Sequence, residues 1–149
     1  MANFNGTARS NYFRVKNGAA FEAAMAALPD IKVWSEVDDG GMERHAIASD
    51  DGDTGCWPSW QCAESMGEYG GDDVDQEDVE VYMPDEIKPH LMDGEVCVLM
   101  QAGAEKLRYI SGYALAFDNT DRPVVHVSLN DIYDKAHKAF GVEPTDASY

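Results

Sequence analysis

The C-terminal third of the chain contains three apolar segments separated by turn residues, and this pattern constrains the fold more than any other feature of the sequence. Residues 96–100 are almost wholly apolar, residues 107–117 form a second run, and residues 124–127 form a third. Asp118-Asn119-Thr120-Asp121, between the second and third runs, is a typical turn. The pattern predicts an antiparallel meander.

The N-terminal third predicts a strand, a helix and two further strands. Residues 11–16 alternate apolar and basic side chains, as a half-buried strand does. A helix is expected over 18–28, because Phe21, Met25 and Leu28 recur at helical spacing after a capping Asn17. Strands are expected over 31–34 and 44–48, joined by the turn at 38–41.

The end of the chain predicts a last helix. Ser128 is expected to cap it with Asp131 three residues later, and Gly141 to end it. One face of this helix is apolar, comprising Leu129, Ile132, Tyr133, Ala136 and Phe140. With a short strand near 79–83, one or two helical turns over 84–91 and a frayed tail over 142–149, residues 1–149 are expected to form a single α+β domain. Its sheet is mainly antiparallel, with five to six strands and a helix near each end of the chain.

The centre of the chain, about 49–86, is expected to be a long acidic loop. The protein has 28 acidic residues against 11 basic ones and a net charge of −17. Between His45 and Ile87 there is no Lys or Arg, yet this interval contains thirteen of the acids. Runs of like charge are usually solvated segments without a partner. Such a charge also repels nucleic acid and anionic lipid, and attracts basic surfaces.

Aromatic residues within the acidic interval favour a binding role, because aromatic side chains anchor interfaces while charges steer association. The alternative is that residues 57–60 fold back into the core, and the two interpretations are compatible. Carboxylates on one fixed face would imitate the phosphates of a nucleic acid. The predicted partner-binding residues are Asp50, Asp51, Asp53, Trp57, Trp60, Glu64, Glu68, Tyr69, Asp72, Asp73, Asp75, Glu77, Asp78 and Glu80.

Other kinds of site have weaker sequence support, and no catalytic residue, metal or cofactor is predicted. Asp51-Gly52-Asp53 and residues 73–77 offer oxygen ligands for Ca²⁺, but neither matches an EF-hand loop. Cys56, Cys62 and His45 are a poor match to zinc-ligand spacing. The four histidines are scattered, and no phosphate-binding loop or hydrolase motif occurs, so an enzyme is not expected.

Three stretches resemble small proteins carried by phages and mobile elements. They are residues 5–16, Trp57-Pro58-Ser59-Trp60 and residues 105–114. Some proteins of that kind are antirestriction or anti-CRISPR factors, and acidic inhibitors among them commonly occupy a nucleic-acid channel. The resemblance therefore implies a host-defence antagonist, and it brings no catalytic motif. Several basic residues lie outside the acidic interval, namely Arg9, Arg14, Lys16, Lys106 and Arg108. Only one face of the molecule is therefore expected to imitate the phosphates of a nucleic acid.

The function expected from the sequence is that of a non-enzymatic inhibitor and DNA mimic. Its expected partner is a basic nucleic-acid-binding host protein, either a CRISPR-Cas effector or a restriction enzyme, with no direct contact to nucleic acid or membrane. The odd count of three cysteines and the polar N-terminus favour the bacterial cytoplasm. Two alternatives remain: an accessory mobile-element protein whose acidity serves only solubility, and a Ca²⁺-binding module. The sequence does not predict the oligomeric state.

Overall fold

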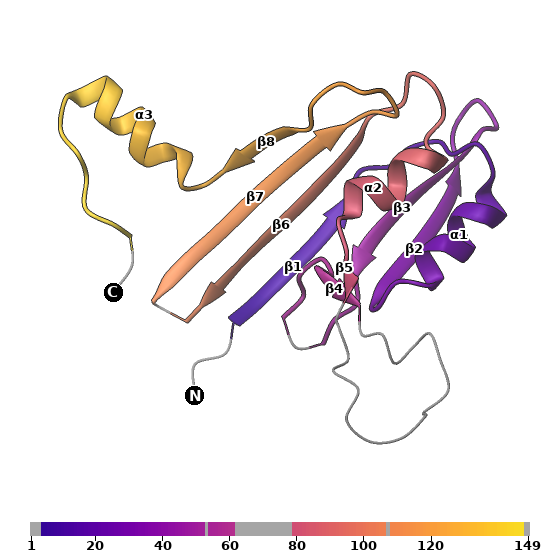
Figure 1. Cartoon of the computed structure of the whole chain (residues 1–149), viewed down its shortest axis with the longest axis horizontal. Coiled ribbons are helices and arrows are strands. Elements are labelled where there is room, and N and C mark those ends of the chain that lie inside the picture. The colour runs from indigo at the N-terminus through magenta and orange to yellow at the C-terminus, as the bar shows by residue number, and fades with distance from the viewer. Residues whose placement is uncertain (1–3, 53, 62–78, 107, 148–149) are drawn as a thin grey trace.

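The fold is a six-stranded antiparallel sheet with two helices on one face and a third helix beyond its edge (Figure 1). The computed structural model describes residues 4–52, 54–61, 79–106 and 108–147. The elements are β1 Phe4–Ser10, α1 Gly18–Ala26, β2 Ile31–Val37, β3 Glu43–Ser49, β4 Trp60–Gln61, β5 Val79–Glu80, α2 Met83–Ile87, the 3₁₀ turn Lys88–His90, β6 Cys97–Glu105, β7 Tyr109–Phe117, β8 Val125–Ser128 and α3 Asp131–Phe140.

The strands of the main sheet lie in the order β2-β3-β1-β6-β7-β8, and every pair is antiparallel. The expected meander is confirmed as β6, β7 and β8, with Leu99 opposite Leu115 and Leu115 opposite His126. The strands β4 and β5 form a separate two-stranded ladder, in which Trp60 lies opposite Glu80. The predicted α+β class and antiparallel sheet are therefore correct.

The predicted strand at residues 11–16 is wrong. The first strand is β1, and residues 11–16 contribute only isolated bridges, from Phe13 to His45 and from Val15 to Leu91. The strand β1 has no apolar alternation of its own. Its extended form is fixed by ladders to β6 on one side and β3 on the other, which are long-range pairings that local periodicity does not report.

The hydrophobic core lies between one face of the sheet and the helices α1 and α2. Phe21 and Met25 of α1 are fully buried there, as their helical spacing predicts. Ile47 and Leu99 face them from the sheet, and Ile87 reaches the same cluster from α2. The core thus covers the β2–β3–β1–β6 part of the sheet and the end of β7 at Phe117, while β8 and the rest of β7 have no buried member of this cluster.

The helix α3 leaves its apolar side uncovered. Figure 1 shows it beyond β8, away from α1 and α2, and none of its residues is buried. Asn130, not the expected Ser128, is the N-cap, although the backbone N–H of Ser128 does donate to the Asp131 carboxylate at 2.8 Å. Gly141 ends the helix in the left-handed conformation with φ 72°, as expected.

A pair of glycines fixes the start of the acidic interval against β1. Gly55 has φ +66°, and a Cβ built on it would lie 1.9 Å from the backbone oxygen of Gly6. No side chain fits between two backbones at that distance. The close approach therefore requires glycine at position 55.

Replacing Gly55 by alanine should lower the free energy of unfolding by about 2–4 kcal/mol, because the strained φ and the clash with Gly6 both oppose the native backbone. Urea denaturation measures the effect. Gly52→Ala is the matched control, since nothing lies within 4 Å of its Cβ position, and it should change stability by less than about 0.5 kcal/mol. Equal stability of the two variants would contradict the glycine contact.

Candidate functional site

The two described parts of the acidic interval meet at the β4–β5 ladder. Residues 54–59 lead from the β3 side of the sheet into β4, and β5 leads into α2. The pairing of Gln61 with Val79 brings together the two residues that flank segment 62–78. Of the predicted partner-binding residues, Asp53, Glu64, Glu68, Tyr69, Asp72, Asp73, Asp75, Glu77 and Asp78 lie outside the described residues, as does the side chain of Trp60.

Trp57 is a core residue. Its side chain is only 7% exposed and packs in the main hydrophobic cluster, and its backbone N–H donates to the Gln101 side-chain oxygen at 2.9 Å. Trp57 therefore folds back into the core, as one of the two interpretations of residues 57–60 predicted. The tryptophan attaches the start of the acidic interval to the sheet.

The two described acids at the start of the interval differ in role. Asp50 is exposed, whereas Asp51 is partly buried and accepts a hydrogen bond from the Thr54 backbone N–H at 3.1 Å. The backbone oxygen of Asp51 accepts another from the N–H of Gly55. The carboxylate of Asp51 therefore stabilises the turn that carries the chain to Trp57.

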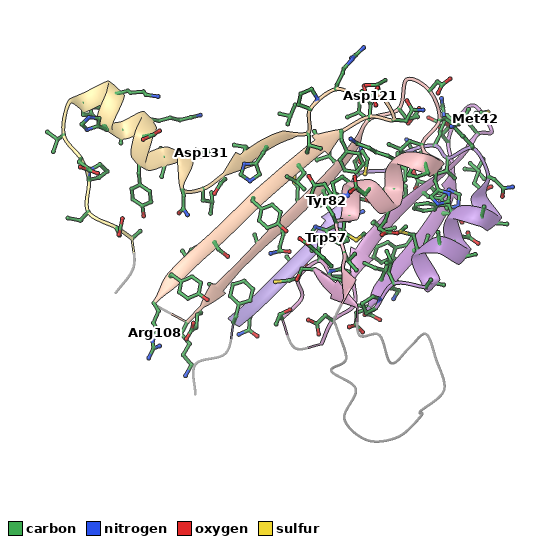
Figure 2. The ribbon with its side chains drawn as sticks, in the orientation of Figure 1. Met42, Trp57, Tyr82, Arg108, Asp121 and Asp131 are labelled. Carbon is green, nitrogen blue, oxygen red and sulfur yellow. The ribbon has the colours of Figure 1, made fainter. Side chains whose placement is uncertain are left out.

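The other end of the interval presents acids around an exposed aromatic ring. Glu80 and Asp85 are exposed, and Tyr82 between them is 46% exposed. Val81 and Met83 are buried on either side of the tyrosine, which fixes the backbone so that Tyr82 points outward. In Figure 2 Tyr82 lies beside α2, above Trp57.

A groove of about 440 Å³ lies next to Tyr82. Its other walls come from the part of the sheet that α1 and α2 leave uncovered, namely Tyr113, Leu115, Val124 and His126. The rings of Tyr113 and His126 are neighbours, with centroids 6.3 Å apart. Burial raises the pKa of Tyr113, so its phenol stays neutral at physiological pH. An apolar wall beside exposed carboxylates is a typical composition for a protein interface.

The opposite face of the sheet, here called the bare face, differs in charge from the rest of the molecule. The strand registers place four charged side chains on it, and three of them are basic: Arg9, Lys32, Arg44 and Glu36. Arg44 pairs with Glu36, while Arg9 and Lys32 lie over the Trp34 ring at 6.0 and 5.7 Å. In a chain with 28 acids, this face is almost free of them.

The bare face also carries an apolar groove of about 390 Å³. Its floor includes Ala102, Gly112 and Ala114, and its sides include Met100, Val127 and Leu129. The exposed apolar side of α3 begins directly after Leu129. Contiguous exposed apolar surface on this scale marks sites of association with other molecules.

Two carboxylates at one end of the sheet, those of Asp38 and Asp118, pair with the basic side chains of Arg14 and Arg122. Figure 2 places Met42 of the β2–β3 turn and Asp121 of the β7–β8 turn together at that end, with Arg108 at the other. Hydrogen bonding to the Arg14 guanidinium, at 2.8 Å, lowers the pKa of Asp38. The Thr120 hydroxyl and backbone N–H lower the pKa of Asp118. Both carboxylates therefore stay ionised well below neutral pH.

His45 is not placed with a cysteine. Within the described ranges its charged neighbours are Glu22 of α1 and Glu43 of β3. Cys56 is not among them, so the structure does not bring Cys56 and His45 together as zinc ligands. Cys62 lies outside the described ranges. Cys56 and Cys97 are free thiols. Burial strongly raises the pKa of Cys97, which makes that thiol a poor nucleophile.

No protein-family model matches the chain, and comparisons with curated proteins and with solved structures find no match. No helix among the described residues is long and apolar enough to cross a membrane.

Proposed function

We propose that the protein is a non-enzymatic inhibitor that binds a basic, nucleic-acid-handling protein through its acidic side. The partner's nucleic-acid groove would be filled by carboxylates in place of phosphates. The partner classes are CRISPR-Cas effectors and restriction enzymes, as the resemblance to mobile-element proteins implies. The phage or mobile-element origin and the bacterial cytoplasm belong to the same proposal.

The observation that carries the proposal is the separation of charge. The described parts of the acidic interval meet at the β4–β5 ladder, and the segment between the ladder strands, 62–78, contains seven acids and no base. The bare face, in contrast, carries three basic side chains and one acidic one. A protein that is acidic only for solubility has no need of such separation, because evenly spread charge keeps it in solution as well.

The structure also offers an apolar anchor in place of Trp57. Tyr82 is exposed between Glu80 and Asp85, next to the groove that Leu115 helps to line. Tyrosines in such positions supply much of the binding energy of protein interfaces, while the charges around them govern the association rate. In the proposal Tyr82 is an anchor in addition to Trp60 and Tyr69, whose side chains lie outside the described part of the chain.

A competition experiment tests the proposal. Purified CRISPR-Cas effectors and restriction endonucleases are incubated with the protein before or after their DNA, and DNA binding and cleavage are measured. The proposal expects inhibition when the protein is added first, and protection when DNA is bound first. A partner that binds the protein and DNA at the same time, without loss of cleavage, would contradict the mimicry.

A further inference from the structure

Three potential metal ligands, Glu22, Glu43 and His45, lie close together in the structure. One ligand atom from each lies within 4.8 Å of the other two. Glu22 belongs to α1, whereas Glu43 and His45 are two residues apart on β3 and therefore point to the same face of that strand. The cluster thus joins the helix α1 to the sheet at a place that the proposed acidic interface does not use.

The imidazole of His45 is buried without a hydrogen bond. Its side chain is 1% exposed, and neither ring nitrogen has a hydrogen-bond partner. The ring packs edge-on against Phe21, with centroids 5.5 Å apart. A buried polar group without a partner costs free energy, so the position of Nε2 calls for an explanation.

The spacing of the donors fits a bound cation better than a direct ion pair. Nε2 of His45 lies 3.4 Å from Glu22 Oε1 and 3.7 Å from Glu43 Oε1. A charge-assisted hydrogen bond from a protonated imidazole would be about 2.7–2.9 Å long. Two ligands on one tetrahedral Zn²⁺, each bound at about 2.1 Å, lie about 3.4 Å apart. The two carboxylates are 52% and 58% exposed, so both can adjust and water can complete the coordination.

Gly18 keeps the approach to the imidazole open. A Cβ at this position would lie 3.3 Å from His45 Nε2 and 3.7 Å from Glu43 Oε2. Gly18 is also the first residue of α1, and the positive end of a helix dipole opposes a cation. The positive end of the helix amounts to about half a unit charge, whereas the carboxylates of Glu22 and Glu43 contribute two negative charges. The net effect of these charges is to attract a cation.

We propose that Glu22, Glu43 and His45 bind one divalent transition-metal ion, with Zn²⁺ as the representative, and so cross-link α1 to β3. An imidazole together with carboxylates suits Zn²⁺ and its first-row neighbours, whereas Ca²⁺ prefers oxygen ligands alone. The site differs from the Cys56–Cys62–His45 arrangement and from the calcium alternatives at 51–53 and 73–77. It is also independent of the proposed function.

Zn²⁺ titration of the full chain tests the site, with binding followed by calorimetry and native mass spectrometry. We expect one tight equivalent of Zn²⁺, a higher melting temperature, and a shift of the His45 Nε2 resonance in ¹⁵N spectra. Ca²⁺ should produce no such shift. The double variant Glu22→Gln/Glu43→Gln changes two exposed side chains and should fold, yet bind Zn²⁺ at least 100-fold more weakly.

The control variant Glu80→Gln/Glu86→Gln loses the same charge outside the cluster of Glu22, Glu43 and His45, and should bind Zn²⁺ as the native protein does. Equal Zn²⁺ affinity in both double variants would mean diffuse attraction to an acidic protein, and would overturn the proposal. An unchanged His45 Nε2 resonance at saturating Zn²⁺ would overturn it as well. Either result would leave His45 as a buried residue that contacts two carboxylates.

Discussion

Replacing Phe21 by alanine should lower the free energy of unfolding by about 3–5 kcal/mol, as measured by urea denaturation. Phe21 is 0% exposed and lies at the centre of an aromatic group, with ring centroids 5.5 Å from Phe13, 5.5 Å from His45 and 5.8 Å from His90. Its removal leaves a cavity between α1 and the sheet that these rings are too constrained to fill. Total stabilities of about 5–15 kcal/mol are usual, so the loss would be a large fraction of the whole.

The matched control is Phe140→Ala, also in a helix. Phe140 is 80% exposed on α3, and its removal should change stability by less than about 0.5 kcal/mol. The comparison separates burial from any general effect of a lost phenylalanine. Similar losses in both variants would contradict the placement of the core under α1, or would mean that α3 is covered in solution.

Neutralising Asp72, Asp73, Asp75, Glu77 and Asp78 together should weaken binding to the partner by about 100-fold. Each exposed ion pair contributes about 0.6 kcal/mol, and five of them give about 3 kcal/mol, or two factors of ten. The substitutions are to Asn and Gln, which keep the size of each side chain. Surface plasmon resonance against the partner measures the change, and most of it should appear in the association rate.

The control for this experiment removes five acids elsewhere. Asp39, Asp121, Asp134, Glu143 and Asp146 are all exposed and lie in the turns, α3 and the C-terminal segment. Their neutralisation gives the same net charge, and binding should change by less than about threefold. If both variants lose the same affinity, the total charge matters and no particular face does, which would remove the mimicry.

The sequence predicts those elements whose signals are local. The strands β6, β7 and β8 are apolar runs between turn residues, and α1 carries its own apolar stripe. The ends of β7, β8 and α1 were predicted within about two residues, whereas β6 continues to Glu105, beyond the predicted end at residue 100. In contrast, β1 depends on partners more than ninety positions along the chain, such as Ala102 opposite Thr7. The segment Phe4–Ser10 does not contain the information that places it in the middle of a sheet.

The candidate sites were predicted less completely than the fold, for a similar reason. The acidic interval is visible in the sequence, but the burial of Trp57 depends on its contacts with the sheet. Glu43 and His45 are two apart on a strand, and this spacing was a usable signal for a shared face. The third member, Glu22, comes from a helix more than twenty residues earlier, and only the packing of α1 on the sheet brings it to His45.

The salt dependence of partner binding is the most direct measurement of the central claim, that a collected acidic surface replaces nucleic acid. Dissociation constants are measured between about 50 and 200 mM NaCl, a range over which interactions between exposed charges are progressively screened. We expect affinity to fall at least tenfold over this range, and to fall less steeply in the variant neutralised at residues 72–78 than in the matched control. An affinity that is the same at both salt concentrations would contradict the account.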